Sequence, residues 1–508
     1  MTFAYELAAG WVANVKSTPL AMRFWSTPEL RMDVVKLRMA LDKLNMLGVR
    51  VLGGIAAAVV LLGQMAALPV RADTMESALL RAYQKNPQLN AQRASVRAVD
   101  EAVPQALSGY RPKVAGTFSA GVQTVDQLAD GSSGKKIEEG LQAPHAATVT
   151  VTQTLYNGNQ TANRTRSAES QVFGAREGLR LLEQSVLLSA ATIYMDYLRD
   201  AAILEVQKSN THVLEVTLKQ TRDRYSAGLV TPTDVAQSQA QLSAAQSQEL
   251  AAVSTLTTTR ANFRRIIGNE PTNLAPASPV DRYLPQTVSA AIELALKQNP
   301  NVTAAMYGVD VSFLTVKINE GALYPTVSVQ AAVSKVWDPT ITTINIFTAA
   351  ANAQLNVPVY QGGAEYSLIR QSKESLEQQR LALEQVRDQA RADLVTAWGQ
   401  LLAGKAQVTA AQSQVDASEI AYLGTTKEAQ VGQRTVIDIL NAQQTLVNAR
   451  VALVTAQHDR IVASYAVLNA VGRLSPQVLH LATPTYDPSV HYQQVRDNWG
   501  GVHTPDGR

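Results

Sequence analysis

Two uninterrupted helical stretches of equal length constrain this chain more than any other feature. About 68 residues separate Asn159 from Ser226, and the same number separate Gly363 from Gln430. An α-helix rises about 1.5 Å per residue, so each stretch would be roughly 100 Å long. Helices of that length do not belong to an ordinary globular core. We therefore expect long packed helices rather than several separate enzyme domains.

A seven-residue spacing of apolar or alanine residues accompanies these helices. It appears at Leu376, Leu383, Ala390 and Ala397, at Leu394, Leu401, Val408 and Val415, and at Leu440, Val447, Val454, Ile461 and Leu468. This spacing is typical of coiled-coil packing. Four shorter helices of about 35 residues are expected near 74–108, 233–267, 287–322 and 437–471. Two of them placed end to end match one long helix, which predicts a continuous helical wall.

The sequence also repeats itself, with a first repeat at 73–275 and a second at 276–475. The segment LYNG at 155–158 matches VYQG at 359–362, and AGLVTPTD at 227–234 matches VGQRTVID at 431–438. The offset between matching landmarks falls from about 213 to about 204 residues along the chain. The first repeat therefore carries a longer insertion.

Each repeat contains two segments in which apolar and polar residues alternate. These segments predict strands near 113–123, 146–155, 326–334 and 347–357. Each is roughly 9 to 11 residues long, which is the length that a tilted strand needs to cross a bilayer. A half-buried sheet of a soluble protein would show the same alternation. The polar, glycine-rich segment 126–145 is expected to be a long hairpin loop.

Tyrosines flank the predicted strands. Tyr110 and Tyr324 precede the first strand of each repeat, and Tyr156 and Tyr360 follow the last. All four would lie at one end of the sheet, as in an aromatic girdle at a membrane interface. Four strands leave two open edges, which hydrocarbon does not tolerate, so copies of the chain are expected to pool their strands in an oligomer.

Composition excludes several classes of function. The 45 basic and 42 acidic residues show no basic run, so a nucleic-acid partner is not expected. The chain has no cysteine, which removes disulfides, thiolate metal sites, cysteine nucleophiles and a lipidated N-terminal cysteine. No catalytic, nucleotide or zinc motif is present. We therefore predict that the chain is not an enzyme and needs no cofactor.

Histidine positions give no strong indication of a metal site. His145, His212 and His458 are isolated in the sequence. The C-terminal stretch 476–508 contains scattered histidines and several prolines and glycines, and we predict an irregular tail. A metal site in this tail is the alternative, but the close spacing of ligands that such a site needs is missing.

Residues 1–72 are expected to be a leader and signal peptide cut after Ala72. The apolar stretch 51–70 approaches membrane-spanning length and follows basic residues, and an uncleaved inner-membrane anchor is the alternative. The mature chain beginning at Asp73 has no further span of about 20 apolar residues, which argues against an energy-coupled inner-membrane transporter.

From 73 to 475 the sequence resembles the TolC family of outer-membrane efflux and secretion channels. The resemblance is carried by the opening DTMESALLRAYQKNP, by Tyr-Arg-Pro before the strands, by two glycine-bearing helix turns and by the closing Ile-Gly and Val-Gly. It implies a mainly α fold with a membrane β-barrel, in which three chains share twelve strands and a long coiled-coil tunnel across the periplasm.

The same resemblance implies a function, partners and a location. The chain would be the passive exit duct of a tripartite efflux or type I protein secretion system in the bacterial outer membrane, gated at its periplasmic tip. Its partners would be two further copies, a periplasmic adaptor (membrane fusion) protein, an inner-membrane pump or ABC transporter, and outer-membrane lipid. A structural or adhesive coiled-coil envelope protein without a channel is the alternative.

The two helix turns are the first site that the resemblance implies. In the family these turns meet the adaptor, which assigns contacts to Ala227, Gly228 and Leu229 and to Val431, Gly432 and Gln433. The simpler alternative is that both glycines only close the hairpins, because glycine readily accepts a left-handed turn conformation.

The second implied site is a gate at the tunnel entrance. The resemblance places Asp438 in a ring of three carboxylates, Asp234 at the matching place of the first repeat, and Arg434 in contacts that hold the closed state. Asn441 stands where a second acid would double the ring, and Ala429 replaces a tyrosine that would support the closed contacts. We therefore expect a single ring of carboxylates and weaker contacts in the closed state. The simpler alternative is a surface ion pair between Arg434 and Asp438, worth about 0.3 to 0.5 kcal/mol.

Overall fold

The computed structural model of the chain describes residues 73–131, 134–340 and 343–507. The expected leader and signal peptide at 1–72 lie outside the described residues. From residue 73 onward the chain forms one compact unit.

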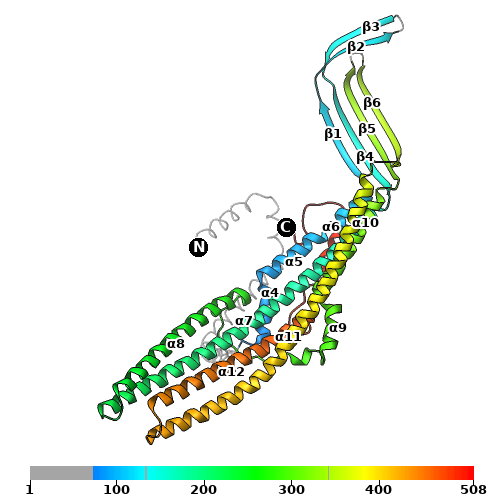
Figure 1. Ribbon diagram of the computed structural model, residues 1–508. Helices are drawn as coiled ribbons and strands as arrows, with labels where there is room; N and C mark the ends of the chain where they lie inside the picture. Colours follow the sequence, from blue (N-terminus) through cyan, green and yellow to red (C-terminus); the bar gives the residue numbers. More distant parts are fainter. Residues whose placement is uncertain (1–72, 132–133, 341–342, 508) are drawn as a thin grey trace, which may run out of the picture. The chain divides into compact units, whose positions relative to one another are not determined.

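Two long helical hairpins form most of this unit. Helices α7 (Gln160–Ser226) and α11 (Ala364–Gln430) have 67 residues each, and they return as α8 (Pro232–Ile267) and α12 (Val436–Ala470). The two hairpins lie side by side with their turns at the same end (Figure 1).

The seven-residue spacing marks the packed faces of α11 and α12. Of the thirteen residues predicted to lie in this seam, eleven are buried, and Val408 and Val454 are partly buried. The coiled-coil prediction is confirmed for these two helices.

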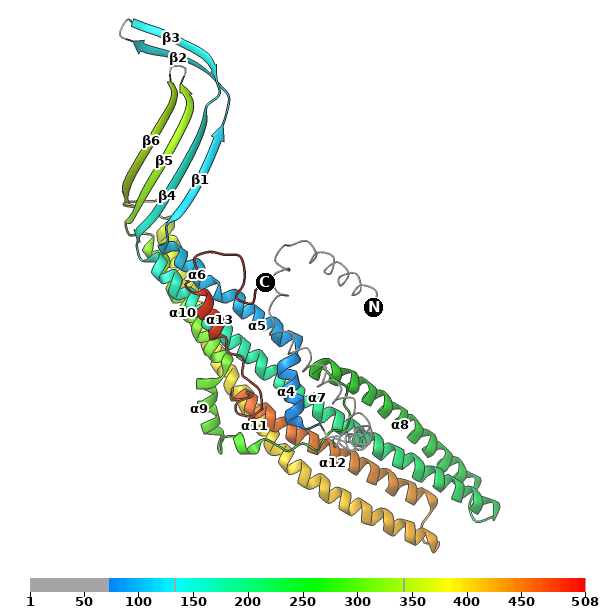
Figure 2. The same ribbon diagram turned by 180° about the vertical axis from the view of Figure 1, so that it is seen from behind.

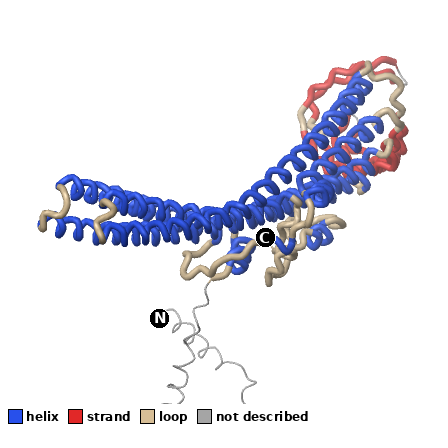
Figure 3. Tube along the Cα trace, turned by 60° about the horizontal axis from the view of Figure 1, so that its bottom comes forward, coloured by secondary structure: helices blue, strands red, loops and turns tan. Residues whose placement is uncertain are grey.

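The strands gather at the other end of the helices (Figure 3). Strands β1 (Lys113–Ala120), β4 (His145–Asn157), β5 (Thr326–Thr340) and β6 (Thr343–Asn356) form an antiparallel sheet in the order β1-β4-β5-β6. Each repeat contributes two neighbouring strands. Within the described part of the chain, β1 and β6 are the edge strands of this sheet.

The segment predicted to be a long loop is instead a second hairpin. Strands β2 (Gln123–Gly131) and β3 (Gly134–Gln142) pair in register from Gln123 with Gln142 to Gly131 with Gly134. The prediction was wrong because polar composition indicates exposure to water and does not prevent backbone pairing between two extended segments. This hairpin is the insertion that lengthens the first repeat.

The shorter helices on the strand side are broken, which the sequence analysis did not predict. Near the N-terminus the breaks separate α4 (Met75–Lys85), α5 (Pro87–Asp100) and α6 (Ala102–Leu107), and a short 3-10 turn, η2 (Ser108–Tyr110), follows. In the second repeat, the 3-10 turn η3 (Asp281–Tyr283) precedes α9 (Val288–Gln298) and α10 (Pro300–Gly321).

An Asn-Pro pair causes the same break in both repeats. Asn86 and Asn299 have extended backbones, and each side chain accepts hydrogen bonds from backbone N–H groups of the following helix. The prolines that follow lack an N–H and disfavour a helical conformation in the residue before them. The Asn-Pro pair therefore interrupts one predicted helix in each repeat.

The main hydrophobic core lies where α4, α5, α7, α8, α12 and the C-terminal segment meet. Tyr194 and Phe263 are fully buried there, with ring centroids 6.4 Å apart. The Tyr194 hydroxyl donates hydrogen bonds to the carbonyl oxygens of Asp73 and Ala275, 2.7 and 2.6 Å away. The start of the described chain is thereby tied to the linker between the two repeats.

The tail predicted to be irregular contains one helix, α13 (Ser489–Val495), which packs beside α5 (Figure 2). The prediction missed this helix because its stabilising contacts come from residues several hundred positions earlier in the chain.

Candidate functional site at the helix turns

Each long hairpin reverses through a short turn that contains one glycine in the left-handed region. Gly228 has φ 73° and Gly432 has φ 82°. The chain then closes back on the long helix, because the N–H of Leu229 donates to the carbonyl of Arg224 and that of Gln433 to the carbonyl of Glu428. A side chain at either glycine would meet open space, so the backbone conformation alone accounts for the two glycines.

A capping box starts each returning helix. Thr231 and Asp234 form it in α8, and Thr435 and Asp438 form it in α12. In α12 the Asp438 carboxylate accepts hydrogen bonds from the Thr435 N–H at 2.9 Å and from its hydroxyl at 2.8 Å. These bonds fix the direction of the carboxylate. The Thr-x-x-Asp pattern of both turns is the sequence signature of a capping box, so this feature could have been predicted from the sequence alone.

The same hydrogen bonds keep both aspartates ionised. The hydrogen bond from the Thr435 N–H is the main reason that the pKa of Asp438 lies below its ordinary value. The side-chain hydrogen bond from Thr231 is the largest cause of the lowered pKa of Asp234. Each chain therefore carries two fixed negative charges at its turns, close to the helix N-termini that favour them.

Arg434 does not form the ion pair with Asp438 that was the simpler alternative to a gate. Its Nε lies 2.8 Å from Glu428 Oε2 across the turn, so the arginine holds the turn to the end of α11. The hydrogen bond to Glu428 is also the main cause of the raised pKa of Arg434. The simple i,i+4 alternative was wrong because the turn brings Glu428 within reach of the Arg434 guanidinium, and Thr435 holds Oδ2 of Asp438.

The six turn residues implied as adaptor contacts are all exposed: Ala227, Gly228, Leu229, Val431, Gly432 and Gln433. Two of them are apolar and protrude, since Leu229 is 74% and Val431 is 72% exposed. Asn441 is also exposed, one turn beyond Asp438 on α12. The two turns thus present a small apolar surface beside fixed carboxylates.

A buried cluster beneath the turns joins the two hairpins. It comprises Leu214, Leu218, Leu242, Ala245, Val436 and Leu440. Gln443 adds a buried hydrogen bond to Asn210 of α7, with 3.1 Å between the two side-chain atoms. The positions of the two turns relative to one another are therefore set by this packing.

The four tyrosines lie at the end of the sheet that joins the helices. Tyr110 ends η2 just before β1, Tyr156 lies at the end of β4, Tyr324 precedes β5 and Tyr360 follows β6. Their side chains are between 40% and 75% exposed.

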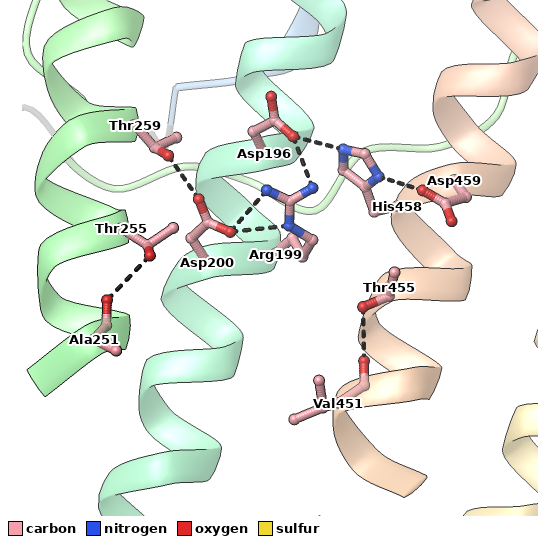
Figure 4. A network of polar contacts seen from close by, with 10 residues as sticks. All are labelled: Asp196, Arg199, Asp200, Ala251, Thr255, Thr259, Val451, Thr455, His458 and Asp459. Carbon is pink, nitrogen blue, oxygen red and sulfur yellow. Dashed lines mark hydrogen bonds and ion pairs between the residues drawn. The ribbon is translucent and has the colours of Figure 1, made fainter. Parts of the chain in front are cut away.

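His458, which is isolated in the sequence, lies in a polar network between α7 and α12 (Figure 4). Its Nε2 is 2.9 Å from Asp196 Oδ1, and its Nδ1 is 2.8 Å from Asp459 Oδ1. Arg199 lies 2.9 Å from both Asp196 and the buried Asp200, and the Thr259 hydroxyl of α8 donates to Asp200 at 2.6 Å. The network therefore joins three helices. No sequence pattern identifies it, because His458 and Asp196 lie 262 residues apart.

Neither metal-binding clusters nor membrane-spanning helices are found in the described ranges. Among residues 73–131, 134–340 and 343–507, no group of three or more His, Cys, Asp or Glu side chains could hold a metal ion. No helix in the same ranges is both long and apolar enough to span a membrane.

Comparison with known proteins identifies the family. Residues 78–269 and 291–473 match the family model described as outer membrane efflux protein. The chain is 38% identical over 458 residues to the outer membrane efflux protein BepC of Brucella suis biovar 1 (strain 1330), with 89% of this chain and 97% of BepC covered. It is 24% identical to the outer membrane protein TolC of Escherichia coli (strain K12), with 79% of this chain and 83% of TolC covered.

The fold is that of solved outer-membrane channels. The crystal structure of the CmeC outer membrane channel of Campylobacter jejuni superimposes with a TM-score of 0.71 at 15% sequence identity, covering 83% of this chain and 89% of CmeC. This chain belongs to the outer membrane efflux protein family. It is an outer-membrane export channel protein, and the alternative of a coiled-coil rod without a channel is set aside.

Proposed function

We propose that three copies of this chain form the exit duct of a tripartite efflux or type I secretion system. The observation that carries the proposal is the four-stranded sheet in the order β1-β4-β5-β6. In the described part of the chain, this order leaves one edge of β1 and one edge of β6 unpaired. Unpaired backbone groups are costly in hydrocarbon, so each β1 edge needs the β6 edge of a neighbouring copy. Three copies supply twelve strands, and the helical hairpins beneath them supply the wall of the tunnel.

Engineered disulfides test this closure directly, because the natural chain has no cysteine. Ala115 in β1 and Ala350 in β6 lie at the same level of the sheet through Thr150 and Ala332. Barrel closure requires a stagger between strands, so Ala115→Cys is combined in turn with single cysteines at positions 346–354. We expect one register to give a covalent trimer in oxidised outer membranes.

The single-cysteine variants serve as controls and should stay uncrosslinked between strands. If no register gives a covalent dimer or trimer, or if the purified protein is a folded monomer in detergent, the proposed closure is wrong.

The relatives include both an efflux protein and a protease secretion protein. They support partners that deliver cargo to the channel, but they do not distinguish between small molecules and proteins as cargo. BepC is an efflux protein, and a relative in Pseudomonas aeruginosa at 23% identity is the alkaline protease secretion protein AprF. We infer that a periplasmic adaptor and an inner-membrane pump or ABC transporter deliver the cargo. Passage through the duct requires no catalytic step by this chain. We further propose that Tyr110, Tyr156, Tyr324 and Tyr360 mark the membrane interface.

The exposed turns are proposed as the adaptor contacts. Replacing Leu229 and Gln433 together by arginine is expected to abolish export, because two large charges would occupy the apolar surface of the turns. Trimer assembly should persist, since both side chains are exposed and lie outside the buried cluster below the turns. Export assays and trimer yield in the outer membrane measure the two effects. Normal export by the double variant would refute the docking assignment.

The Asp438 carboxylate is proposed to form a negative ring at the tunnel entrance. In planar bilayers, Asp438→Asn is expected to reduce cation preference and block by multivalent cations, because a carboxylate ring in a constriction favours cations. The asparagine oxygen can still accept the hydrogen bond from Thr435, so the helix start should survive. Arg434→Ser should raise the closed-state conductance, because it removes the ion pair with Glu428 that holds the turn.

A matched control for the ring is Asp388→Asn. Asp388 is an exposed carboxylate on α11, far from the turn, and it pairs with Arg391. It should leave ion selectivity unchanged. Equal selectivity of Asp438→Asn and the natural protein would show that Asp438 does not face the conduction path.

A further inference from the structure

The C-terminal segment, described from 476 to 507, is held along α5 and α7 by a series of cationic side chains. The Arg93 guanidinium lies between two aromatic rings, 4.6 Å from the centroid of Tyr83 and 5.1 Å from that of Tyr486. The Tyr486 N–H also donates to the Tyr83 hydroxyl at 3.2 Å. The segment is therefore fixed to α4 and α5 at its start.

Helix α13 continues this attachment toward the strands. His491 Nδ1 lies 3.0 Å from the carboxylate of Asp100, which is fully buried. The Arg176 guanidinium of α7 lies 5.1 Å from the centre of the Tyr492 ring, and Arg496 pairs with Glu169 at 3.7 Å. These contacts hold the segment in one path up to residue 496.

The segment then reaches the base of the sheet. Arg111, two residues before β1, donates a hydrogen bond to the carbonyl of Asn498, and its guanidinium lies 4.8 Å from the centre of the Trp499 ring. At and just after this contact two apolar side chains face solvent, because Trp499 is 73% and Val502 is 93% exposed.

We propose that Trp499 and Val502 insert into the periplasmic leaflet of the outer membrane and anchor the C-terminal segment to lipid. Tryptophan favours the membrane interface, where its ring contacts apolar chains and its N–H stays near polar groups. The position next to Arg111 sets the depth, since Tyr110 and the first residue of β1, Lys113, lie at the same base of the sheet. Arg111 and Lys113 add positive charge where lipid phosphates would lie. This inference rests on the proposed placement of the strands in the membrane.

Lipid quenching of tryptophan fluorescence tests the anchor. The full protein, carrying Trp337→Phe and Trp398→Phe, is reconstituted into phosphatidylethanolamine and phosphatidylglycerol vesicles with or without brominated acyl chains. The same protein with Trp499→Phe is the blank, and its residual emission is subtracted. We expect brominated lipid to cause a loss of Trp499 emission, and aqueous acrylamide to quench it less in vesicles than in the detergent-free unfolded protein.

A tryptophan at a second position distinguishes failure of the proposed lipid anchor at Trp499 from failure of the proposed placement of the strands in the membrane. Phe118→Trp, in the blank background, places a tryptophan on an exposed position of β1. Quenching of this reporter by brominated lipid without quenching of Trp499 would overturn the anchor and leave the barrel in place. Absence of quenching at both positions would overturn the membrane placement as well. Protection of Trp499 from both quenchers would show that protein covers it, and would also overturn the proposal.

The background substitutions need a safeguard against misfolding. The difference in emission between the natural protein and its Trp499→Phe variant gives the same quantity with Trp337 and Trp398 intact. Arg111→Gln is expected to decrease the quenching of Trp499 by lipid, because the ring loses the group that holds it at the base of the sheet.

Discussion

Replacing Gly158 by alanine is expected to abolish trimer assembly in the outer membrane, whereas Gly362→Ala should leave most of it intact. The two glycines occupy matching places in the repeats, at the passage from strand to long helix. Both have positive φ, 64° and 70°, so both substitutions carry the same backbone cost of about 1 to 2 kcal/mol.

Only Gly158 is also pressed against another part of the backbone. A Cβ at Gly158 would clash with the carbonyl oxygen of Gly321 and lie 3.0 Å from the Cβ of Tyr324, whereas a Cβ at Gly362 meets nothing within 4 Å. Gly321 is the last residue of α10, which leads into β5, so relief of the clash would move the entry to the second pair of strands. Overpacking of rigid backbone is expected to cost about 3 kcal/mol or more beyond the shared term.

The amount of heat-resistant trimer in outer-membrane fractions measures this difference. Gly321→Ala provides a second test from the opposite side, because its Cβ would lie 2.6 Å from the Gly158 carbonyl oxygen. Equal trimer yields for Gly158→Ala and Gly362→Ala would show that the junction rearranges freely.

Removing the Asp196 carboxylate is expected to destabilise the protein much more than removing that of Asp459. Both carboxylates contact the buried His458 ring at similar distances. Asp196 also pairs with Arg199, and its side chain is 24% exposed, whereas that of Asp459 is 52% exposed. Asp196→Ala would leave His458 with only the more exposed Asp459 and Arg199 with only Asp200, at a cost of about 2 to 3 kcal/mol per chain, against less than about 1 kcal/mol for Asp459→Ala. Thermal dissociation of the trimer distinguishes the two variants.

The same network predicts a pH dependence. Burial acts most strongly on the pKa of His458 and alone would lower it, but the hydrogen bonds to Asp196 and Asp459 together outweigh burial and raise the pKa. Both ring nitrogens face carboxylates, so the charged ring donates two hydrogen bonds and the neutral ring only one. The stabilisation is therefore fully present below the ordinary histidine pKa of about 6.5 and is lost as the pH rises through the raised value.

Trimer dissociation temperatures between mildly acidic and alkaline pH measure this effect. The natural protein should lose stability across that window, and His458→Gln should show a flatter profile. A profile unchanged by His458→Gln would indicate that other groups cause the pH dependence.

Several features of the fold could be read from local sequence. The helical periodicity of α7 and α11 predicted their lengths to within about a residue, and the seven-residue spacing identified the buried seam of α11 and α12. The glycines at 228 and 432 marked the turns because a left-handed backbone has few alternatives. The family could also be recognised, since these landmarks occur in a fixed order. Each of these features depends on residues that are close in the chain.

Tertiary structure decided which distant groups meet. The sequence presents Gly158 and Gly362 as equivalent, and only the packing of α10 against the first junction makes one of them irreplaceable. His458 and His491 read as isolated residues until the fold brings Asp196 and Asp100 to them. Such contacts join positions hundreds of residues apart, and local periodicity carries no information about which faces of two distant helices come together. The sequence by itself therefore determined the long helices, their turns and the strands of the main sheet, whereas the β2–β3 hairpin, the polar partners and the path of the C-terminal segment were decided by tertiary contacts.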